Sequence, residues 1–167
     1  MTILEKAPES SALVRFQDCD PLGHLNNSKY IDYMINARED HLINIYDINI
    51  FKLAQTEGRT WVVGQHELSY VKPAFVMEKV ILQTRLIHFA PKYVQAEMVM
   101  MNANKSQLKA VLWSKFFHYD VRTQKSIEHS AEHMSLFEQL VIPPNHTKVE
   151  ERARHLAAEL NSESAMA

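Results

Sequence analysis

The sequence predicts an α+β fold in which a curved antiparallel sheet lies across one long helix, with a helical C-terminal extension. Three patterns indicate this fold. An amphipathic helical stretch begins near Asn26 or Asn27, strand-like segments follow between Thr60 and Tyr119, and charged helical segments begin near Ser130.

Size and composition indicate one globular domain. Of the 167 residues, we expect 1–160 to form this domain, with the core at about 13–119, the helical extension at 130–160 and a frayed tail at 161–167. The net charge of -2, from 18 basic and 20 acidic residues, argues against a nucleic-acid partner, which needs clustered Lys and Arg. No stretch approaches the ~18 apolar residues of a membrane span, and the N-terminus lacks a signal-peptide core, so we expect a cytoplasmic protein.

The long helix has one apolar and one polar face. Either Asn26 or Asn27 can cap it. The apolar face carries Tyr30, Ile31, Met34, Ala37, Leu42 and Ile45, and the opposite face carries Lys29, Asp32, Asn36, Glu39 and Asp40. Arg38 lies near the buried side, where we expect an ion pair with a nearby acid. A shorter helix over 49–57 should end at Gly58, a left-handed C-cap.

Strand patterns occupy most of the remaining core. We expect a short strand at 13–16 and a meander of four long antiparallel strands at about 60–71, 76–89, 93–101 and 108–119, the last of them central. Helices should follow at about 130–141 and 149–160. Because the sheet would leave edges and apolar surface uncovered, we expect a homo-oligomer, either a dimer or a tetramer.

The loop over 18–27 concentrates the reactive side chains. It holds two carboxylates (Asp18 and Asp20), the imidazole of His24 and the carboxamides of Asn26 and Asn27, and it leads directly into the helix. The N–H groups at a helix start can stabilise an oxyanion. A carboxylate just upstream can attack a carbonyl or deprotonate water beside it. This combination fits hydrolysis of an activated acyl group.

Two motifs resemble a known fold family. Phe16-Gln17-Asp18-Cys19-Asp20-Pro21, followed by Gly23, resembles the opening motif of the 4-hydroxybenzoyl-CoA thioesterase family of hot-dog proteins. The segment 23–30 resembles the corresponding part of plant-type acyl-carrier-protein thioesterases, and 67–74 resembles the second strand of that family with its Pro-Ala turn. The chain departs from many bacterial acyl-CoA members, which carry an aromatic-His pair in place of Asn26-Asn27.

The resemblance implies a hot-dog fold, at least a dimer, and active sites at the subunit interface. It implies that Asp20 is the catalytic carboxylate, as nucleophile or general base, that His24 assists, and that a backbone N–H near Asn27 holds the oxyanion. We assign substrate binding to Asn26, Tyr30, Glu67 and Lys72. The substrate would be an acyl-CoA or acyl-carrier-protein thioester, hydrolysed by water without a metal or organic cofactor, within fatty acid metabolism.

Each residue also has a structural interpretation. Asp20 could form an Asx turn before Pro21, Asp18 could support the loop, and Glu67 could lie on a solvated sheet face. The thiol of Cys19 fits small buried packing better than nucleophilic attack. His129 and His133 have metal-ligand spacing, but no third ligand is apparent. The alternative functions are a non-catalytic acyl-binding hot-dog protein and a hot-dog dehydratase or hydratase.

Overall fold

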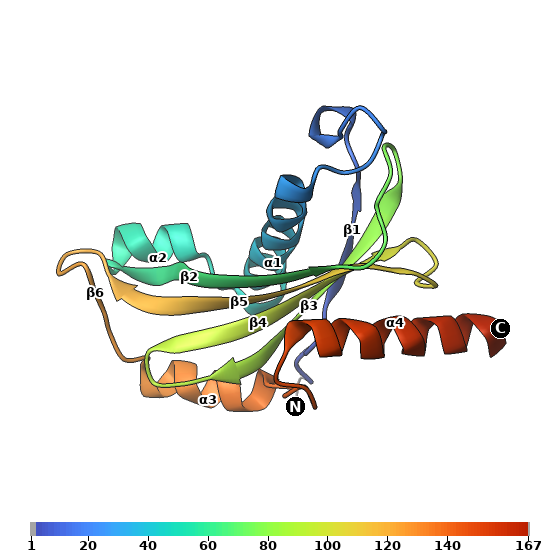
Figure 1. Ribbon diagram of the computed structural model, residues 1–167. Coiled ribbons are helices and arrows are strands. Elements are labelled where there is room, and N and C mark those ends of the chain that lie inside the picture. Colours follow the sequence, from blue (N-terminus) through green and yellow to red (C-terminus); the bar gives the residue numbers. More distant parts are fainter. Residues whose placement is uncertain (1–2, 167) are drawn as a thin grey trace.

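The computed structural model describes residues 3–166 and shows a curved sheet with a long helix on each face (Figure 1). The elements follow in the order β1 (Glu9–Leu13), η1 (Phe16–Asp18), η2 (Asn27–Lys29), α1 (Tyr30–Tyr46), α2 (Ile50–Thr56), β2 (Arg59–Tyr70), β3 (Lys79–Phe89), β4 (Tyr93–Asn102), β5 (Leu108–Asp120), β6 (Lys125–Ser126), α3 (Ala131–Leu140) and α4 (Val149–Met166). The predicted α+β arrangement is confirmed.

The strand order of the sheet is β1-β3-β4-β5-β2, and every pairing is antiparallel. β5 is central, as predicted, because β4 and β2 flank it. The prediction of a simple four-strand meander is wrong in one respect, since β2 pairs with β5 and not with β3. Lys72-Pro73 interrupts the pairing after β2, and the segment 71–78 crosses the end of the sheet instead of forming a tight hairpin. β2 is therefore an edge strand.

Three predicted boundaries differ from the structure. The first strand spans Glu9–Leu13 and not 13–16, because its Ser-rich sequence pairs only at the edge of β3 and gives little apolar signal. Neither Asn26 nor Asn27 caps the helix through its side chain; a 3₁₀ turn, η2, precedes α1 instead. The predicted frayed tail is helical up to Met166, as the last part of α4, and Ala167 lies outside the described residues.

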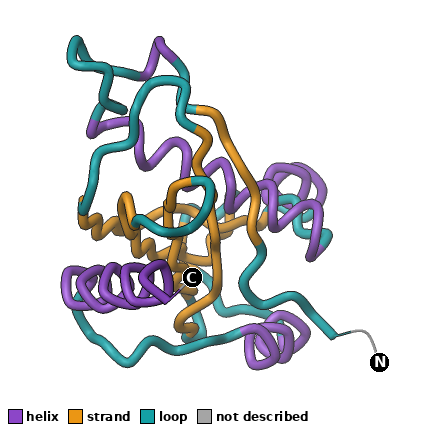
Figure 2. Tube along the Cα trace, turned by 90° about the vertical axis from the view of Figure 1, so that its right-hand side faces the viewer, coloured by secondary structure: helices purple, strands orange, loops and turns teal. Residues whose placement is uncertain are grey.

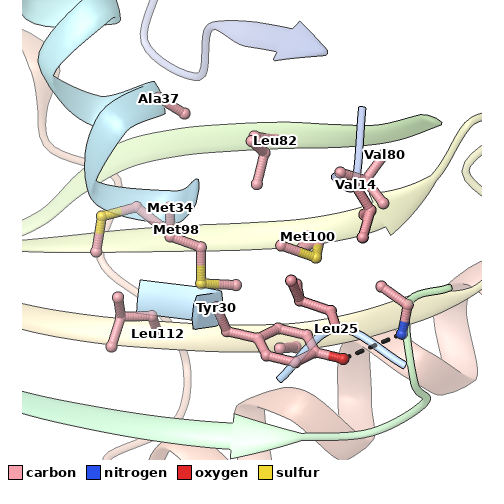
Figure 3. Close-up of a cluster of buried hydrophobic side chains, with 12 residues drawn as sticks. Val14, Leu25, Tyr30, Met34, Ala37, Val80, Leu82, Met98, Met100 and Leu112 are labelled. Atoms are coloured by element: carbon pink, nitrogen blue, oxygen red, sulfur yellow. Dashed lines mark hydrogen bonds between the residues drawn. The ribbon is translucent and has the colours of Figure 1, made fainter. Parts of the chain in front are cut away.

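The main core lies between α1 and the concave face of the sheet. Tyr30, Met34 and Ala37 of α1 pack on Leu82, Met98, Met100 and Leu112 of the strands (Figure 3). Each such buried side chain contributes roughly 1.5–3 kcal/mol relative to exposure. Ile45, which we expected on the buried face, is 40% exposed. Ile45 therefore lies outside the buried stripe of α1, whereas the neighbouring Tyr46 packs against the cluster around Leu86.

The opposite face of the sheet is covered by α4, and Figure 2 shows the strands between the helices. Glu97 of β4 is 1% exposed beneath α4. It accepts hydrogen bonds from Arg85, Trp113 and Arg152 at 2.8–3.2 Å. This fully paired carboxylate fixes α4 to the sheet. None of the described helices combines the length and the apolar character that crossing a membrane requires.

Candidate active site

Asp20 lies in a tight loop whose backbone fixes one of its carboxylate oxygens. Its Oδ1 accepts the N–H groups of Leu22 at 2.9 Å and His24 at 3.0 Å. The Asp20 N–H donates to the His24 carbonyl at 2.8 Å, the Gly23 N–H donates to the Asp20 carbonyl at 3.0 Å, and Gly23 adopts a left-handed conformation (φ 77°), which together close the loop. No donor from residues 3–166 bonds Oδ2. The carboxylate is therefore oriented through one oxygen, and its second oxygen is available for chemistry.

Asp18 stabilises this loop, in agreement with the structural role that the sequence suggested for it. Its Oδ2 accepts the hydroxyl of Tyr33 at 2.6 Å, and the same hydroxyl accepts the N–H of Arg15 at 3.0 Å. The thiol of Cys19 donates to the Arg15 carbonyl at 3.3 Å. Burial, and then the charges of Asp18 and Asp20, raise the pKa of this thiol, which therefore stays protonated at neutral pH. Cys19 is not activated as a nucleophile.

His24 lies on the opposite side of the loop, against the turn that follows β2. Its ring packs edge-on against Phe75 with 5.2 Å between the ring centroids. That turn is held from below by Lys109, which is only 2% exposed. The Lys109 ammonium contacts Glu78 at 2.8 Å and the Pro73 carbonyl at 3.0 Å. His24 is thus positioned by a buried ion pair that the sequence pattern did not reveal.

The start of α1 joins the end of β2 beside the loop. The hydroxyl of Tyr70 donates to the Asn27 carbonyl at 2.9 Å, and the side chains of Asn26 and Asn27 are exposed. The leading N–H groups of a helix have no partner within it, so η2 presents donors here. Tyr30 is 3% exposed, and its hydroxyl accepts the N–H of Ala74 at 3.0 Å (Figure 3). Tyr30 is therefore buried under the site, where its hydroxyl fixes the backbone of Ala74.

Two further residues assigned to substrate binding, Glu67 and Lys72, lie outside the Asp20 loop. Glu67 alternates along β2 with Leu68, which packs against α1, so Glu67 points to the opposite face of the sheet. There it accepts a hydrogen bond from Gln65 at 3.0 Å. Lys72 is exposed in the segment that crosses the end of the sheet. Asp20, His24, Asn26, Asn27 and Lys72 therefore remain exposed enough to meet a ligand, whereas Tyr30 and Glu67 do not face one in this chain.

A second feature is an apolar cavity at the other end of α1. It is enclosed by α1, α2, α3 and the strands β2, β3, β4 and β5, and the cavity has a volume of about 120 Å³. Its walls include Leu42, Trp61, Leu86, Phe116 and Phe137. This volume is below the ~300–1,000 Å³ typical of pockets that bury drug-sized molecules, and the cavity is continuous with open space at the surface. Arg38 and Glu39 are the charged residues that line it.

Metal chemistry has no ready set of ligands in the described part of the chain. Residues 3–166 contain no group of three or more His, Cys, Asp or Glu side chains placed to hold a metal ion. His129 and His133 instead pack around Trp61, with His118, as part of the junction between β2, β5 and α3.

The chain belongs to the thioesterase-like superfamily, whose family model matches residues 14–148. This membership and the fold confirm the predicted hot-dog architecture and the predicted class of activity, hydrolysis of acyl thioesters. Among curated proteins, the long-chain acyl-CoA thioesterase FadM of Escherichia coli strain K12 is 25% identical over 128 residues, which cover 77% of this chain and 95% of FadM.

Solved structures show the same architecture. The probable thioesterase YbaW from Escherichia coli superposes with a TM-score of 0.69 at 24% identity, covering 80% of this chain and 98% of that one. Slr0204, a 1,4-dihydroxy-2-naphthoyl-CoA thioesterase from Synechocystis, gives a TM-score of 0.72 at 12% identity, with coverage of 82% and 99%. A DHNA-CoA thioesterase from Staphylococcus aureus gives 0.69 at 18% identity and covers 95% of both chains. At these identities the structural likeness concerns the fold.

Proposed function

We propose that this protein hydrolyses acyl-CoA thioesters and that Asp20 is its catalytic carboxylate. The observation that carries the proposal is the loop geometry in a member of the thioesterase-like superfamily. Two main-chain N–H groups orient Asp20 Oδ1, and Oδ2 has no partner among residues 3–166. A carboxylate held in this way beside the start of a helix supplies both parts of acyl-transfer chemistry, a base or nucleophile and donors for the oxyanion.

The proposed mechanism uses Asp20 as a general base. Oδ2 takes a proton from water, and the resulting hydroxide adds to the thioester carbonyl. The oxyanion is stabilised by main-chain N–H groups at η2, near Asn27. As the carbonyl re-forms, the C–S bond breaks, and the thiolate leaves and is protonated. The main-chain N–H of His24 holds Asp20 Oδ1, and we propose that its imidazole, which packs against Phe75, assists in orienting the carbonyl.

We further propose that two copies pair through the free edge of β2. The strand is exposed over 62–66, and pairing would satisfy its outer backbone groups. An antiparallel two-fold arrangement about Gly64 and Gln65, in the middle of β2, would place the Tyr70 end of one protomer next to the Arg59 end of its partner. The Asp20 loop of one protomer would then lie near the cavity of its partner, and the cavity would take the acyl chain.

The exposed apolar side chains around the loop are consistent with such an assembly. Phe16 is 83% exposed, Leu22 is 78% exposed and Met77 is 62% exposed. Such a patch needs a partner or a ligand to cover it. The similarity to FadM, a long-chain acyl-CoA thioesterase, also supports a role in fatty acid metabolism, which we propose takes place in the cytoplasm.

Turnover of an acyl-CoA panel, followed by trapping of the released thiol, tests the function. We expect hydrolysis by the parent protein and a loss of at least about a hundredfold in kcat for Asp20→Asn, since a positioned acid or base typically contributes ~10²–10⁴-fold. The amide retains an oxygen acceptor for the two loop N–H groups, so folding should persist. Asp40→Asn, an exposed position on α1, is the matched control and should retain parental turnover.

Two results would contradict the proposal. Parental turnover in Asp20→Asn would remove Asp20 from the mechanism. Tight binding of acyl-CoAs without any thiol release by the parent protein would favour an acyl-binding protein over an enzyme. Acyl-carrier-protein thioesters in the same panel distinguish the two carriers.

A further inference from the structure

The cavity beneath α1 contains a charge that the protein does not balance. Arg38 is 8% exposed and lines the cavity. Its Nη1 donates to Thr84 Oγ1 at 3.2 Å. Within residues 3–166, no Asp or Glu oxygen lies within 4.0 Å of a guanidinium nitrogen of Arg38. The predicted ion pair of this arginine with a nearby acid is therefore wrong.

The other polar groups around Arg38 are neutral. Thr84 Oγ1 also bonds Nδ1 of His41 at 2.7 Å, and Nε2 of His41 bonds the hydroxyl of Ser10 at 2.9 Å. Burial, and then the charge of Arg38, lower the pKa of His41, so the imidazole is neutral at pH 7. Burial lowers the pKa of Arg38 to about 10, and the guanidinium therefore keeps its charge at pH 7.

This arrangement leaves guanidinium donors that no group among residues 3–166 satisfies and that face the cavity. A buried cation without an anion loses hydration that one hydroxyl does not replace. Arginine has five N–H donors in a planar fork, and a carboxylate matches that fork with two parallel hydrogen bonds. The remaining walls are mainly aliphatic and aromatic, which suits a methylene chain.

Glu39 is the second charged residue of the cavity, and it does not neutralise Arg38. Its side chain is partly exposed, and burial, followed by the charge of Asp40, raises the pKa of its carboxyl group. Glu39 would weakly oppose a bound anion. Replacing Glu39 should therefore not weaken the binding of a carboxylate, whereas replacing Arg38 should weaken it.

We propose that Arg38 binds a carboxylate at the end of the acyl group remote from the thioester, so that the preferred substrates are CoA thioesters of dicarboxylic acids. The inference rests on the proposed thioesterase function and names its substrate class. The apolar walls hold the methylene chain, and the guanidinium selects the terminal carboxylate over a methyl group.

The test compares matched thioesters. The kcat/KM is measured for hexanoyl-, decanoyl- and tetradecanoyl-CoA and for the mono-CoA thioesters of the corresponding dicarboxylic acids. Because a buried charge binds much more weakly when its partner is missing, we expect the carboxylate to raise kcat/KM at least about tenfold for one chain length or more. In Arg38→Met that advantage should disappear, while turnover of the methyl-ended thioesters stays within about threefold of the parent. Glu39→Gln should retain or increase the advantage.

Binding is measured separately, through the fluorescence of Trp61, which lines the cavity. Decanoyl-CoA and the decanedioic mono-CoA thioester are titrated into Asp20→Asn, with and without Arg38→Met. We expect tighter binding of the dicarboxylic thioester, and loss of that difference when Arg38 is replaced.

The outcomes separate the two proposals. If the parent hydrolyses methyl-ended thioesters and the carboxylate lowers turnover at every chain length, the inference about Arg38 is overturned and the thioesterase function stands. If no thioester is hydrolysed, the proposed function fails, and the fluorescence titration alone decides the role of Arg38. A preference for hydroxyl- or keto-bearing chains over carboxylates, or a carboxylate preference that survives Arg38→Met, also overturns the inference.

Discussion

The buried histidine His129 should make the stability of this protein fall in mild acid. The residue is 8% exposed. Its Nε2 accepts the indole N–H of Trp61 at 3.0 Å, and its Nδ1 bonds the Ala90 carbonyl at 3.0 Å. The imidazole is therefore held in its neutral form, and a proton on Nε2 would face the Trp61 donor. Burial, and then the charge of His118, lower the pKa of His129 to about 4.

The size of the effect follows from proton linkage. In the unfolded chain a histidine has a pKa near ~6.5, so the unfolded state takes up a proton between that pH and about 4 while the folded state does not. The contribution of His129 to stability is thus fully present above the pKa of the unfolded state and is lost as the pH falls toward the pKa of the folded state. For His129 alone the free energy of unfolding should drop by about 2 kcal/mol between pH 8 and pH 5.

The neighbouring ionisable groups either add to this loss of stability between pH 8 and pH 5 or affect stability only at lower pH. Burial also lowers the pKa values of His118 and His133, which makes the loss on acidification steeper. The pKa of Glu97 is held below its ordinary value by Arg152 and Arg85 despite its burial, so its contribution is lost only at lower pH.

Urea unfolding at pH 8 and pH 5 measures the effect. In His129→Gln, whose amide can both accept from Trp61 and donate to Ala90, the drop in unfolding free energy between the two pH values should be smaller by about 2 kcal/mol than in the parent. His88→Gln, at an exposed position, should leave the drop unchanged. An equal drop in His129→Gln and the parent would refute the assignment.

Two further predictions concern packing. Glu97→Gln should lower the free energy of unfolding by about 3–5 kcal/mol, because it leaves Arg85 and Arg152 without their buried anion, whereas the exposed Glu159→Gln should change it by less than about 0.5 kcal/mol; urea unfolding compares them. Gly64→Ala should cost about 1–3 kcal/mol, because its Cβ would lie 2.3 Å from Cε2 of Phe117, and an unchanged unfolding midpoint would show that the ring moves freely.

Features that depend on a few neighbouring residues could be predicted from the sequence. The short helix predicted over 49–57 is present as α2, Gly58 follows it with φ 67°, and the helix predicted from about 130 begins at Ala131, because each of these features depends on a few neighbouring residues. Val94, Ala96, Met98 and Met100 alternate along β4, a strand predicted at 93–101, and they share one face because a strand repeats every two residues. The loop over 18–27 was identified as reactive because it gathers unusual side chains within a short stretch.

The pairing of strands that are distant in the sequence could not be predicted in the same way. The position of β2 beside β5 depends on which strand edges remain free once β1 has joined β3, and the periodicity of a segment does not encode that choice. β1 itself was misplaced because a polar edge strand carries little apolar alternation. Glu67 has a side chain of the kind found in active sites. The alternation of side chains along β2, however, places it on the sheet face opposite Asp20.

The amino-acid sequence by itself determined the class of fold, the helix that lies across the sheet and the loop that carries Asp20, because short-range periodicity and local composition specify them. Only the tertiary structure decided that Arg38 is buried without an anion, that Lys109 supports the turn beside His24, and that β2 lies at a free edge. Burial and charge balance are properties of all the segments that surround a residue, and these segments come together only in the folded chain.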